Sequence, residues 1–356
     1  MAGKKITMAD IALELDLSIN AVSLALNDRA GVSEDTRRKI LNKAEELGYL
    51  ELNKKYAATY SNRNICILLE HRFFSDMHFY GKVLLGLESE AKDAGYDVLI
   101  HSFERHSQET PGCVEKGKVS GIVIIGKIED AFLIKLKKYR IPIVLIDWIS
   151  LEESMDCVIT DNKLGNFKMT KYLIDQGFQK IGFVGEFAYS PSVRERFWGF
   201  QEALQVYMGM DFEKSMEYIK RYSMLNEIEK YVMHNDSKAL AEGFQTIPEV
   251  PEALMCSNDR AAILMCKALE GLGYKVPQDI SVVGFDDIEL CKMVTPRITT
   301  VHVNKELMGK RGMQKLIYRL EHPEDKIEKI IMDVRIVERD SVRSRAADGD
   351  AKEQKL

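Results

Sequence analysis

From residue 64 onward, short and continuously apolar runs alternate with longer segments of helical periodicity. Strands that are apolar at every position are buried on both faces, as in parallel sheets with helices on each side. The strands expected from this pattern are 65–69, 97–100, 121–125, 143–146, 157–159, 181–184, 253–256 and 281–284. The clearest helices expected between or after them are 80–94, 164–176, 196–207, 259–272 and 305–320. So many units over about 280 residues exceed one compact open sheet, so the pattern predicts two doubly wound parallel-sheet lobes with a cleft between them.

The remaining residues divide into three further parts. Residues 1–50 contain short helical patterns with tight turns and no strand pattern. Residues 51–63 are polar and lack a hydrophobic period, which is typical of a hinge or linker. The core is expected to span 64–342, and the polar segment 343–356 is expected to be a disordered tail. The fold class expected is therefore an N-terminal all-α domain followed by a two-lobed α/β core.

Composition excludes several classes of protein. The 356 residues are 46% hydrophobic and 29% charged, which is a globular composition. No apolar run approaches the roughly 20 residues that span a bilayer, and no signal core follows the first residues, so we expect a cytoplasmic chain without a membrane partner. The net charge of −5, with nine basic and nine acidic residues among the first 62, supplies no basic field for DNA. Any DNA binding must therefore depend on where the basic residues are placed.

Cysteine and histidine give no sign of a metal or cofactor. The six cysteines form no C-x-x-C pair, and several lie in apolar runs, which is typical of reduced core thiols. No histidine has the spacing of a zinc ligand. We therefore expect no metal and no cofactor.

The first fifty residues carry the signals of three capped helices. Thr7 and Asp10 have capping-box spacing before the first helix, and Ser18 can cap a second helix over 19–26. Ser33 can cap a third helix over 34–47, which Gly48 can end. Two short helices joined by a tight turn and supported by a third predict a helix-turn-helix domain. Its second helix would enter the major groove of DNA.

This region resembles the lactose/galactose repressor (LacI/GalR) family of bacterial transcription regulators. The segments that carry the resemblance are 6–12 (ITMADIA), 17–18, 22–23, 26–27, 32–37 and 47–49. Further segments of the core resemble the same family: 161–165 (DNKLG), 180–185 (KIGFVG), 196–200 (RFWGF), 257–262 (SNDRAA), 272–287 and 337–342. The resemblance covers residues 6–342 and implies a core like the periplasmic sugar-binding proteins, with the chain crossing between the lobes three times.

The resemblance also implies which residues meet DNA. The set is Thr7, Ser18, Ile19, Asn20, Ser23, Leu24, Asn27 and, in the hinge, Ala58. Asn20 and Ile19 occupy base-reading positions, where the amide can pair with adenine and the apolar side chain can touch a thymine methyl. Ser18, Ser23 and Asn27 suit phosphate contacts.

The chain departs from the family at several of these positions. Asp16, Ala21 and Leu24 stand where relatives usually carry Gly, Thr and Arg. Losing the arginine removes a guanine reader, so the operator is expected to differ from the family norm. Ala58 replaces the hinge leucine that wedges into the minor groove; an alanine cannot separate base pairs as a leucine does, which leaves kinking by this hinge open.

A second set of residues is expected to bind a small effector in the cleft. Polar residues at strand ends and helix starts of open α/β sheets are where ligands bind. With the family resemblance, the expected set is Phe79, Asp147, Asp161, Arg196, Asn258, Asp259 and Asp286. Carboxylates, an amide and a guanidinium grip sugar hydroxyls, while an aromatic face covers the ring. Asn258 and Asp161 can equally be helix caps, and both interpretations stay open.

No catalytic constellation stands out. Residues 121–127 (GIVIIGK) resemble a phosphate-binding loop, but Ile128 stands where a serine or threonine would bind magnesium, and the pattern between the glycines predicts a buried strand.

We therefore expect a homodimeric, non-enzymatic transcriptional regulator, most simply a repressor, that binds double-stranded DNA at a near-palindromic operator. A small effector, by family default a carbohydrate, would control its affinity. Pairing of dimers into tetramers stays open.

Two other hypotheses stay open. One is a sugar-metabolising enzyme with an accessory N-terminal domain. The other is a ligand sensor that no longer binds a specific operator, which Leu24 and Ala58 motivate.

Overall fold

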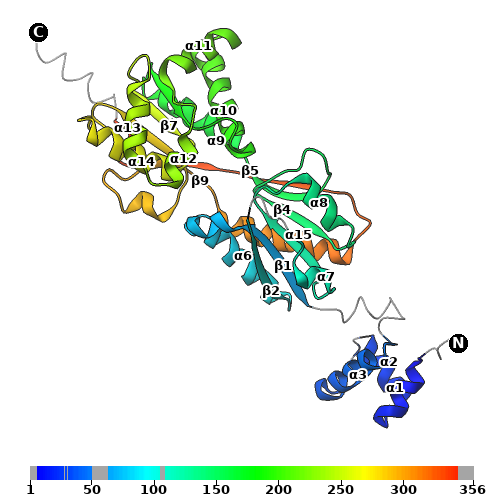
Figure 1. Cartoon of the computed structure of the whole chain (residues 1–356). Helices are drawn as coiled ribbons and strands as arrows, with labels where there is room; N and C mark the ends of the chain where they lie inside the picture. The colour runs from blue at the N-terminus through cyan, green and yellow to red at the C-terminus, as the bar shows by residue number, and fades with distance from the viewer. Residues whose placement is uncertain (1–5, 28, 30, 50–62, 105–108, 344–356) are drawn as a thin grey trace, which may run out of the picture.

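The computed structural model describes residues 6–27, 29, 31–49, 63–104 and 109–343. Ala58, almost all of the expected linker and nearly all of the expected tail lie outside these residues. Figure 1 shows a small helical domain near the N-terminus and a larger core of two lobes. Among the described residues, no helix combines the length and the apolar character needed to cross a membrane.

Three helices form the N-terminal domain: α1 (Met8–Leu15), α2 (Ile19–Leu26) and α3 (Glu34–Glu46). Thr7 and Asp10 make the expected capping box, and the hydroxyl of Ser18 accepts a hydrogen bond of 3.0 Å from the amide of Ala21. Asp16 adopts the left-handed conformation (φ 54°) in the turn between the first two helices. The helix-turn-helix prediction is therefore confirmed, with the third helix ending one residue earlier than expected.

The first lobe contains a parallel six-stranded sheet in the order β10-β5-β4-β3-β1-β2. Its strands are β1 (Asn64–Glu70), β2 (Asp97–Phe103), β3 (Gly121–Ile125), β4 (Ile143–Ile146), β5 (Asp156–Thr160) and β10 (Lys329–Met332). One face packs against α6 (Tyr80–Asp93) and α15 (Lys305–Glu321). The other face packs against α7 (Gly112–Glu115) and α8 (Asp130–Lys137). The predicted burial on both faces is confirmed for β1, β3, β4 and β5 but is wrong for the edge strand β2, most of whose residues are exposed or half-buried.

The second lobe contains a five-stranded sheet in the order β11-β9-β8-β7-β6. Its strands are β6 (Ile181–Val184), β7 (Ala253–Cys256), β8 (Ser281–Asp286), β9 (Thr299–His302) and β11 (Arg335–Val337). One face packs against α9 (Asn162–Asp175), α10 (Pro191–Met208) and α11 (Phe212–Tyr222). The other packs against α12 (Ile228–Met233), α13 (Ser237–Gln245) and α14 (Asp259–Gly271). The sheet is parallel except for β11, which pairs with β9 in the antiparallel direction.

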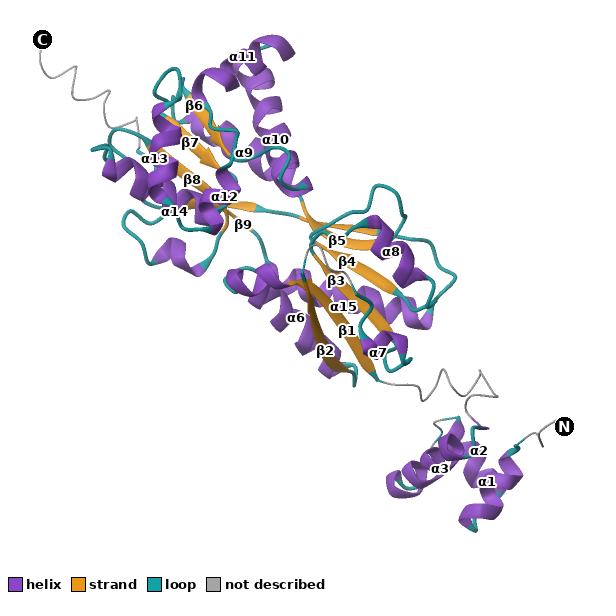
Figure 2. Cartoon of the chain, in the orientation of Figure 1, coloured by secondary structure: helices purple, strands orange, loops and turns teal. Residues whose placement is uncertain are grey.

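The chain passes between the lobes three times, as the resemblance implied. The passages lie between β5 and α9, between β9 and α15, and between β10 and β11. Figure 2 shows these connections converging between the two sheets. The edges of the two sheets that border the cleft therefore lie where the chain passes from one lobe to the other.

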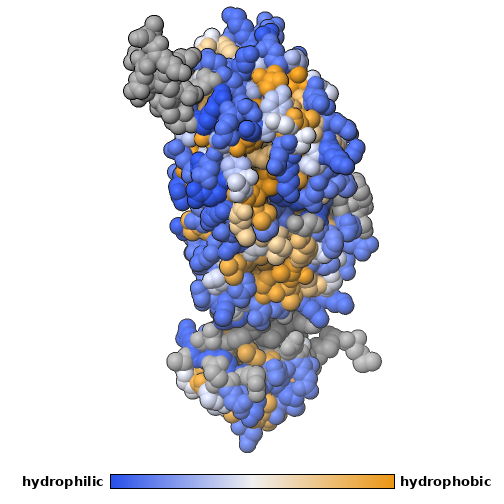
Figure 3. Space-filling view, turned by 90° about the vertical axis from the view of Figure 1, so that its left-hand side faces the viewer, coloured by the Kyte–Doolittle hydropathy of each residue, from blue (hydrophilic) through white to orange (hydrophobic). Residues whose placement is uncertain are grey.

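The surface is largely hydrophilic, with hydrophobic residues gathered in limited patches on the face shown in Figure 3. Exposed apolar side chains include Leu85 on α6 and Ile100 on β2, which are 50% and 52% exposed. They belong to neighbouring elements of the first lobe, because α6 packs next to β2.

Two helix pairs approach closely through glycine. A β-carbon on Gly86 of α6 would lie 2.0 Å from the carbonyl oxygen of Glu306 on α15. The pair α9 and α10 is built in the same way, since a β-carbon on Gly199 would lie 2.0 Å from the carbonyl of Lys163. Backbone atoms cannot move aside as a flexible side chain can, so these glycines set the helix spacing in both lobes.

We therefore expect Gly86→Ala to lower the free energy of unfolding by roughly 1–3 kcal/mol, because the added methyl group forces the two helices apart. Urea unfolding followed by circular dichroism measures the change. The control is Gly271→Ala at the end of α14, where no atom lies within 4 Å of an added β-carbon. That variant should match the wild type or gain up to about 1 kcal/mol from helix propensity. Equal stability of the Gly86 and Gly271 variants would contradict this account of helix packing.

Candidate functional site

The start of α2 forms an exposed polar and apolar tip. Ser18, Ile19 and Asn20 are all exposed, and the apolar Ile19 is 55% exposed. The hydroxyl of Ser18 caps the helix, which orients the first turn, while Asn20 makes no hydrogen bond among the described contacts. Consecutive exposed residues at a helix N-terminus can face the edges of bases in a major groove.

The other expected DNA residues are more constrained. The side-chain amide of Asn27 donates to the carbonyl oxygen of Ser23 at 2.8 Å, so Asn27 closes the end of α2. Leu24 lies against the following loop, with its Cδ1 3.0 Å from the position of a β-carbon on Gly31. Thr7 is exposed but engaged with Asp10 in the capping box. Its hydroxyl therefore contributes to the start of α1.

Arg37 of α3 connects the third helix to the end of α2, a role that the sequence did not reveal. Its guanidinium donates to the carbonyl oxygens of Ala25 at 3.2 Å and Arg29 at 2.8 Å. The side chain is only 8% exposed. A buried arginine bound to the end of α2 fixes the direction in which that helix presents its tip.

A cavity of about 220 Å³ lies between the two lobes of the core. That volume is below the roughly 300–1,000 Å³ typical of pockets for drug-sized ligands, so the cavity suits a molecule of monosaccharide size. Its walls on the first lobe come from the turn 71–76, the start of α6 and the segment after β4. Its walls on the second lobe come from α10, α12, the start of α14 and the end of β8.

Five of the expected effector residues lie on these walls: Phe79, Asp147, Arg196, Asn258 and Asp286. Asn258 is also the cap of α14, because its Oδ1 accepts a hydrogen bond of 2.9 Å from the amide of Ala261. The two interpretations of this residue are therefore compatible.

Asp161 and Asp259 do not line the cavity, contrary to expectation. Asp161 caps α9 by accepting a hydrogen bond from the amide of Leu164 at 3.1 Å, and it borders a separate shallow depression. Asp259 is fully buried, where it accepts hydrogen bonds from the hydroxyl of Thr300 and, at 2.8 Å, the amide of Ile288. Both carboxylates are committed to the backbone and core of the second lobe. Asp161 directly follows β5 and Asp259 begins α14, but the cap of α9 and the buried contacts of α14 occupy their carboxylates.

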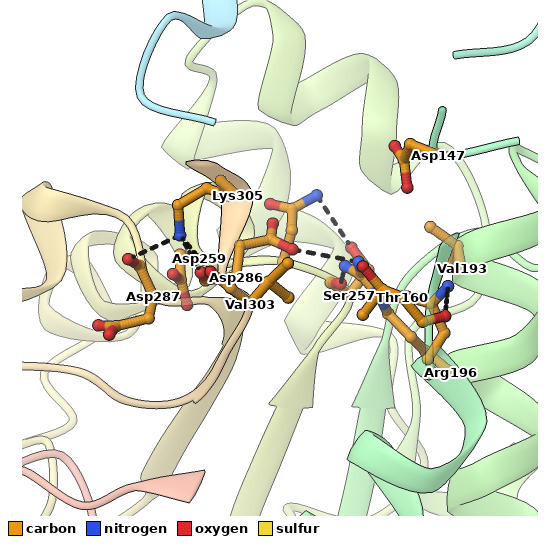
Figure 4. A network of polar contacts seen from close by, with 12 residues as sticks. Asp147, Thr160, Val193, Arg196, Ser257, Asp259, Asp286, Asp287, Val303 and Lys305 are labelled. Atoms are coloured by element: carbon orange, nitrogen blue, oxygen red, sulfur yellow. Dashed lines mark hydrogen bonds and ion pairs between the residues drawn. The ribbon is translucent and has the colours of Figure 1, made fainter. Parts of the chain in front are cut away.

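Arg196 is the centre of the polar network in Figure 4, which also shows Ser257 and Asp286 beside it. Its guanidinium donates to Asn162 Oδ1 at 2.9 Å, to the carbonyl oxygen of Ser257 at 2.6 Å and to Asp286 Oδ1 at 3.1 Å. The group also lies over the ring of Phe285, 3.8 Å from its centroid. Four segments of the second lobe are thereby fixed around one nearly buried cation.

The backbone is strained at the cavity. Asp147, Asp286 and Asp287 have positive φ angles of 59°, 112° and 55°. The ammonium group of Lys305 holds the last two in place by donating to the carbonyl oxygens of both, and to that of Val303. Such conformations persist only where surrounding contacts impose them, and they concentrate at functional sites.

Burial changes the acidity of the cavity carboxyls. It raises the pKa of Asp147 to about 7; the charge of Asp286 adds to this rise, while Arg196 and the hydroxyl of Tyr80 oppose it. Burial likewise raises the pKa of Asp286 to about 6, with Arg196 opposing the rise. The pKa values of Asp76 and Glu229 are also raised by burial. The cavity therefore contains carboxyl groups that can exchange protons near neutral pH.

Several cavity residues lie outside the expected set of effector residues. They are Arg72, Phe73, Asp76, Tyr80, Trp148, Tyr189, Glu229 and Arg260. The signal for some of them was weak but present, because the polar and aromatic segments 71–78 and 187–191 lie between regular elements. Among the described residues, no group of three His, Cys, Asp or Glu side chains is arranged to hold a metal ion.

Comparisons with known proteins agree with both parts of this architecture. Residues 7–51 match the model of bacterial regulatory proteins of the lacI family, and residues 170–342 match the periplasmic binding protein-like domain. The chain is 29% identical over 342 residues to the probable HTH-type transcriptional repressor ExuR of Bacillus subtilis (strain 168). The alignment covers 95% of this chain and 98% of that protein.

Solved structures show the same fold. The lac repressor dimer bound to operator and the anti-inducer ONPF has a TM-score of 0.65 and 23% identity, covering 95% of this chain and 99% of that one. A LacI family transcriptional regulator from Enterococcus faecium with bound ribose has a TM-score of 0.67 and 22% identity. In that case the match covers 78% of this chain and 99% of that chain.

The raised pKa of Asp147 gives a stability prediction. Because the pKa is about 7 in the folded chain and about 3.9 in an unfolded one, the folded state binds more protons in this window. The free energy of unfolding should therefore fall as the pH rises from 4 to 7, by on the order of 3 kcal/mol. Asp147→Asn removes the titration, so the variant should melt at a higher temperature than the wild type at pH 8 and show a clearly smaller gain at pH 5.

Melting temperatures of the two proteins between pH 5 and 8 measure the effect. Asp93→Asn, at an exposed position at the end of α6, is the control and should leave the pH profile unchanged. Parallel profiles for the wild type and the Asp147 variant would show that Asp147 does not titrate as described.

Proposed function

The chain belongs to the LacI family of bacterial regulatory proteins, and from that premise we propose that it is a cytoplasmic repressor that binds a near-palindromic operator as a homodimer. A small sugar in the interlobe cavity would control its affinity. The observation that carries this proposal is the presence, in one chain, of an exposed α2 tip and a polar cavity whose walls come from two lobes.

DNA recognition is assigned to the α2 tip. Asn20 pairs with an adenine edge and Ile19 contacts a thymine methyl group, while Ser18 and Ser23 contact phosphates. Leu24 lies against the loop at Gly31. That position supports a role for Leu24 in packing the domain. The operator would then lack the guanine that an arginine at this position reads.

The homodimer would pair two such tips at the two halves of the operator. Exposed apolar side chains on α6 and β2, among them Leu85 and Ile100, support an interface on the first lobe. Monomers joined there would hold their N-terminal domains at a fixed separation. Only DNA with matching half-site spacing would then bind tightly.

Control by the effector follows from the shared walls of the cavity. A ligand that contacts Asp147 on one lobe and Arg196 with Asp286 on the other binds one lobe arrangement better than another. That difference in affinity is all that a population shift requires. The three interlobe passages would carry the change to the N-terminal domain.

The cavity binds its ligand without converting it. Asp286 is paired with Arg196 and held through its backbone by Lys305, which supports a gripping role over acid–base exchange. Turnover of any sugar by the purified chain would argue for an enzyme instead.

The first test is a salt-titrated binding assay of the purified chain with DNA flanking its own gene and with a random duplex. We expect selective binding with a steep salt dependence, because phosphate contacts release counterions. If neither duplex is preferred, selection from random-sequence DNA follows. Failure to enrich any sequence would reject the repressor and favour a sensor without an operator.

Asn20→Ala should weaken binding to the operator found in that assay by about 1–3 kcal/mol and relax the preference at one base position, because it removes a base-edge contact. Titrations with the operator and its single-base variants measure both effects. Leu13→Ala, an 83% exposed position on α1, is the control and should bind like the wild type. Unchanged affinity and specificity of the Asn20 variant would show that Asn20 does not read a base.

Asp286→Asn should abolish the response of operator binding to the effector, because it removes the negative charge that pairs with Arg196 at the cavity wall. The measurement is operator affinity with and without ligand. Asp175→Asn, an exposed position at the end of α9, should keep the full response. A normal ligand response in the Asp286 variant would move the effector site elsewhere.

A further inference from the structure

The first lobe presents two carboxylates to the cavity that form no ion pair among the described residues. Asp147 accepts one hydrogen bond, from the hydroxyl of Tyr80 at 3.2 Å. Asp76 has a buried Oδ1 without any hydrogen-bond partner. Both residues line the cavity. In Figure 4, Asp147 stands apart from the contacts around Arg196.

The neighbouring cations are occupied elsewhere. Arg72 pairs with Glu70 at 2.8 Å and lies over the rings of Phe73 and Tyr189. Arg196 pairs with Asp286.

Two further cations line the cavity, Arg260 and Lys127. Arg260 has only long contacts, to the carbonyl oxygen of Val232 at 3.4 Å and to Asn235 at 3.5 Å. Lys127 is exposed. Arg260 acts on Asp76, whose pKa its charge lowers against the larger effect of burial, but it forms no ion pair with either acid.

Within the part of the chain that the structure describes, the neighbouring charged groups do not form ion pairs with the carboxylates of Asp147 and Asp76. Asp147 is influenced by Arg196, Tyr80, Asp286 and Glu195. Asp76 is influenced by Arg260, His78, Lys305 and the backbone amide of Phe79. Despite the cations among these groups, burial keeps the pKa of each carboxyl above its ordinary value. Tyr80 lies within the field of both carboxylates, since both raise its pKa.

A ligand can supply the missing charge. A neutral hydroxyl donates one hydrogen bond but leaves the carboxylates unneutralised, whereas an ammonium group offers three donors and a positive charge. A carboxylate on the ligand would add a further negative charge beside Asp76 and Asp147 and be repelled. The aromatic residues Phe79 and Trp148 on the same wall can cover the apolar face of a sugar ring.

We propose that the effector is a monosaccharide-sized polyol carrying a protonated amine, such as an amino sugar, whose ammonium group is bound by Asp147, with Asp76 as a second acid on the same lobe of the cavity. This rests on the proposed function in one respect, namely that the interlobe cavity is the effector site. It specifies the chemical class of the ligand. Hydroxyl groups of the same molecule reach Arg196, Asp286 and Asn258 on the opposite wall.

The test is calorimetric titration of the full chain at pH 7 with D-glucosamine, D-galactosamine and D-mannosamine. Each is compared with its neutral parent sugar, its N-acetyl derivative, and D-glucuronate or D-galacturonate. We expect at least one amine to bind about tenfold or more tightly than its parent, because a charged hydrogen bond replaces a neutral one. N-acetylation, which removes the charge, should abolish that advantage.

A second readout is proton release. An ammonium group that binds at Asp147 displaces the proton this carboxyl holds near neutral pH, so the observed heat should change with the ionisation enthalpy of the buffer. Asp147→Asn should remove the proton release and reduce the preference for the amine to less than about twofold, while Asp93→Asn preserves both.

The inference is overturned if no amine binds better than its parent, or if a uronate binds more tightly than every amine. Binding of the same protein sample to its operator without sugar separates the two levels of the argument. Retained operator binding with no preference for amines rejects the ligand class alone. Loss of selective DNA binding rejects the repressor itself.

Discussion

The second lobe depends on one nearly buried guanidinium at the cleft. Arg196 reaches from α10 to the start of α9, the end of β7 and the end of β8, and it lies over Phe285. A buried cation is tolerated only when its donors and its charge are satisfied, so these segments must keep their present positions together. Asp286 cannot move independently, because its side chain pairs with Arg196 and its backbone is held by Lys305. The cavity wall on this side is therefore rigid.

The same contacts lie beside the passages between the lobes. Lys305 begins α15 immediately after the chain leaves β9, and its ammonium group binds the strained turn after β8. Asp287 in that turn accepts a hydrogen bond from Arg339, beyond β11, and contacts His302 of β9 at 2.8 Å. The cavity residue Asp286 is therefore adjacent in sequence to Asp287, whose contacts with Lys305, His302 and Arg339 hold two of the three passages between the lobes. Few contacts therefore link the cavity to the interlobe passages, and a change between two arrangements of the lobes requires such a link.

All eight expected strands are present, and most of them are apolar at every position because both of their faces are covered. The expected set missed β9, which is buried inside the second sheet but begins with two threonines, and the edge strands β10 and β11. β10 is a partly exposed edge strand, and β11 is three residues long, so neither leaves such a run. At the site, the rule that ligands bind at strand ends and helix starts correctly selected Asp147, Arg196 and Asp286. The same rule also selected Asp259, whose side chain is instead held by contacts with Thr300 and Ile288. Asp76 ends the turn 71–76 and Tyr80 begins α6, and their approach to the cavity is set by tertiary contacts that no local pattern encodes.

Backbone strain and buried carboxyls whose pKa is raised coincide at the cavity. Asp147 combines a positive φ angle with a buried carboxyl whose pKa is raised, and Asp286 does the same on the opposite lobe. Each feature costs the folded chain stability, and neither is needed to build a sheet of this kind. A ligand that donates to both carboxyls offsets the electrostatic part of that cost only when it touches both walls at once. The binding energy of such a ligand would therefore favour one separation of the lobes over all others, so the groups that cost the fold stability are also the groups through which a ligand would act.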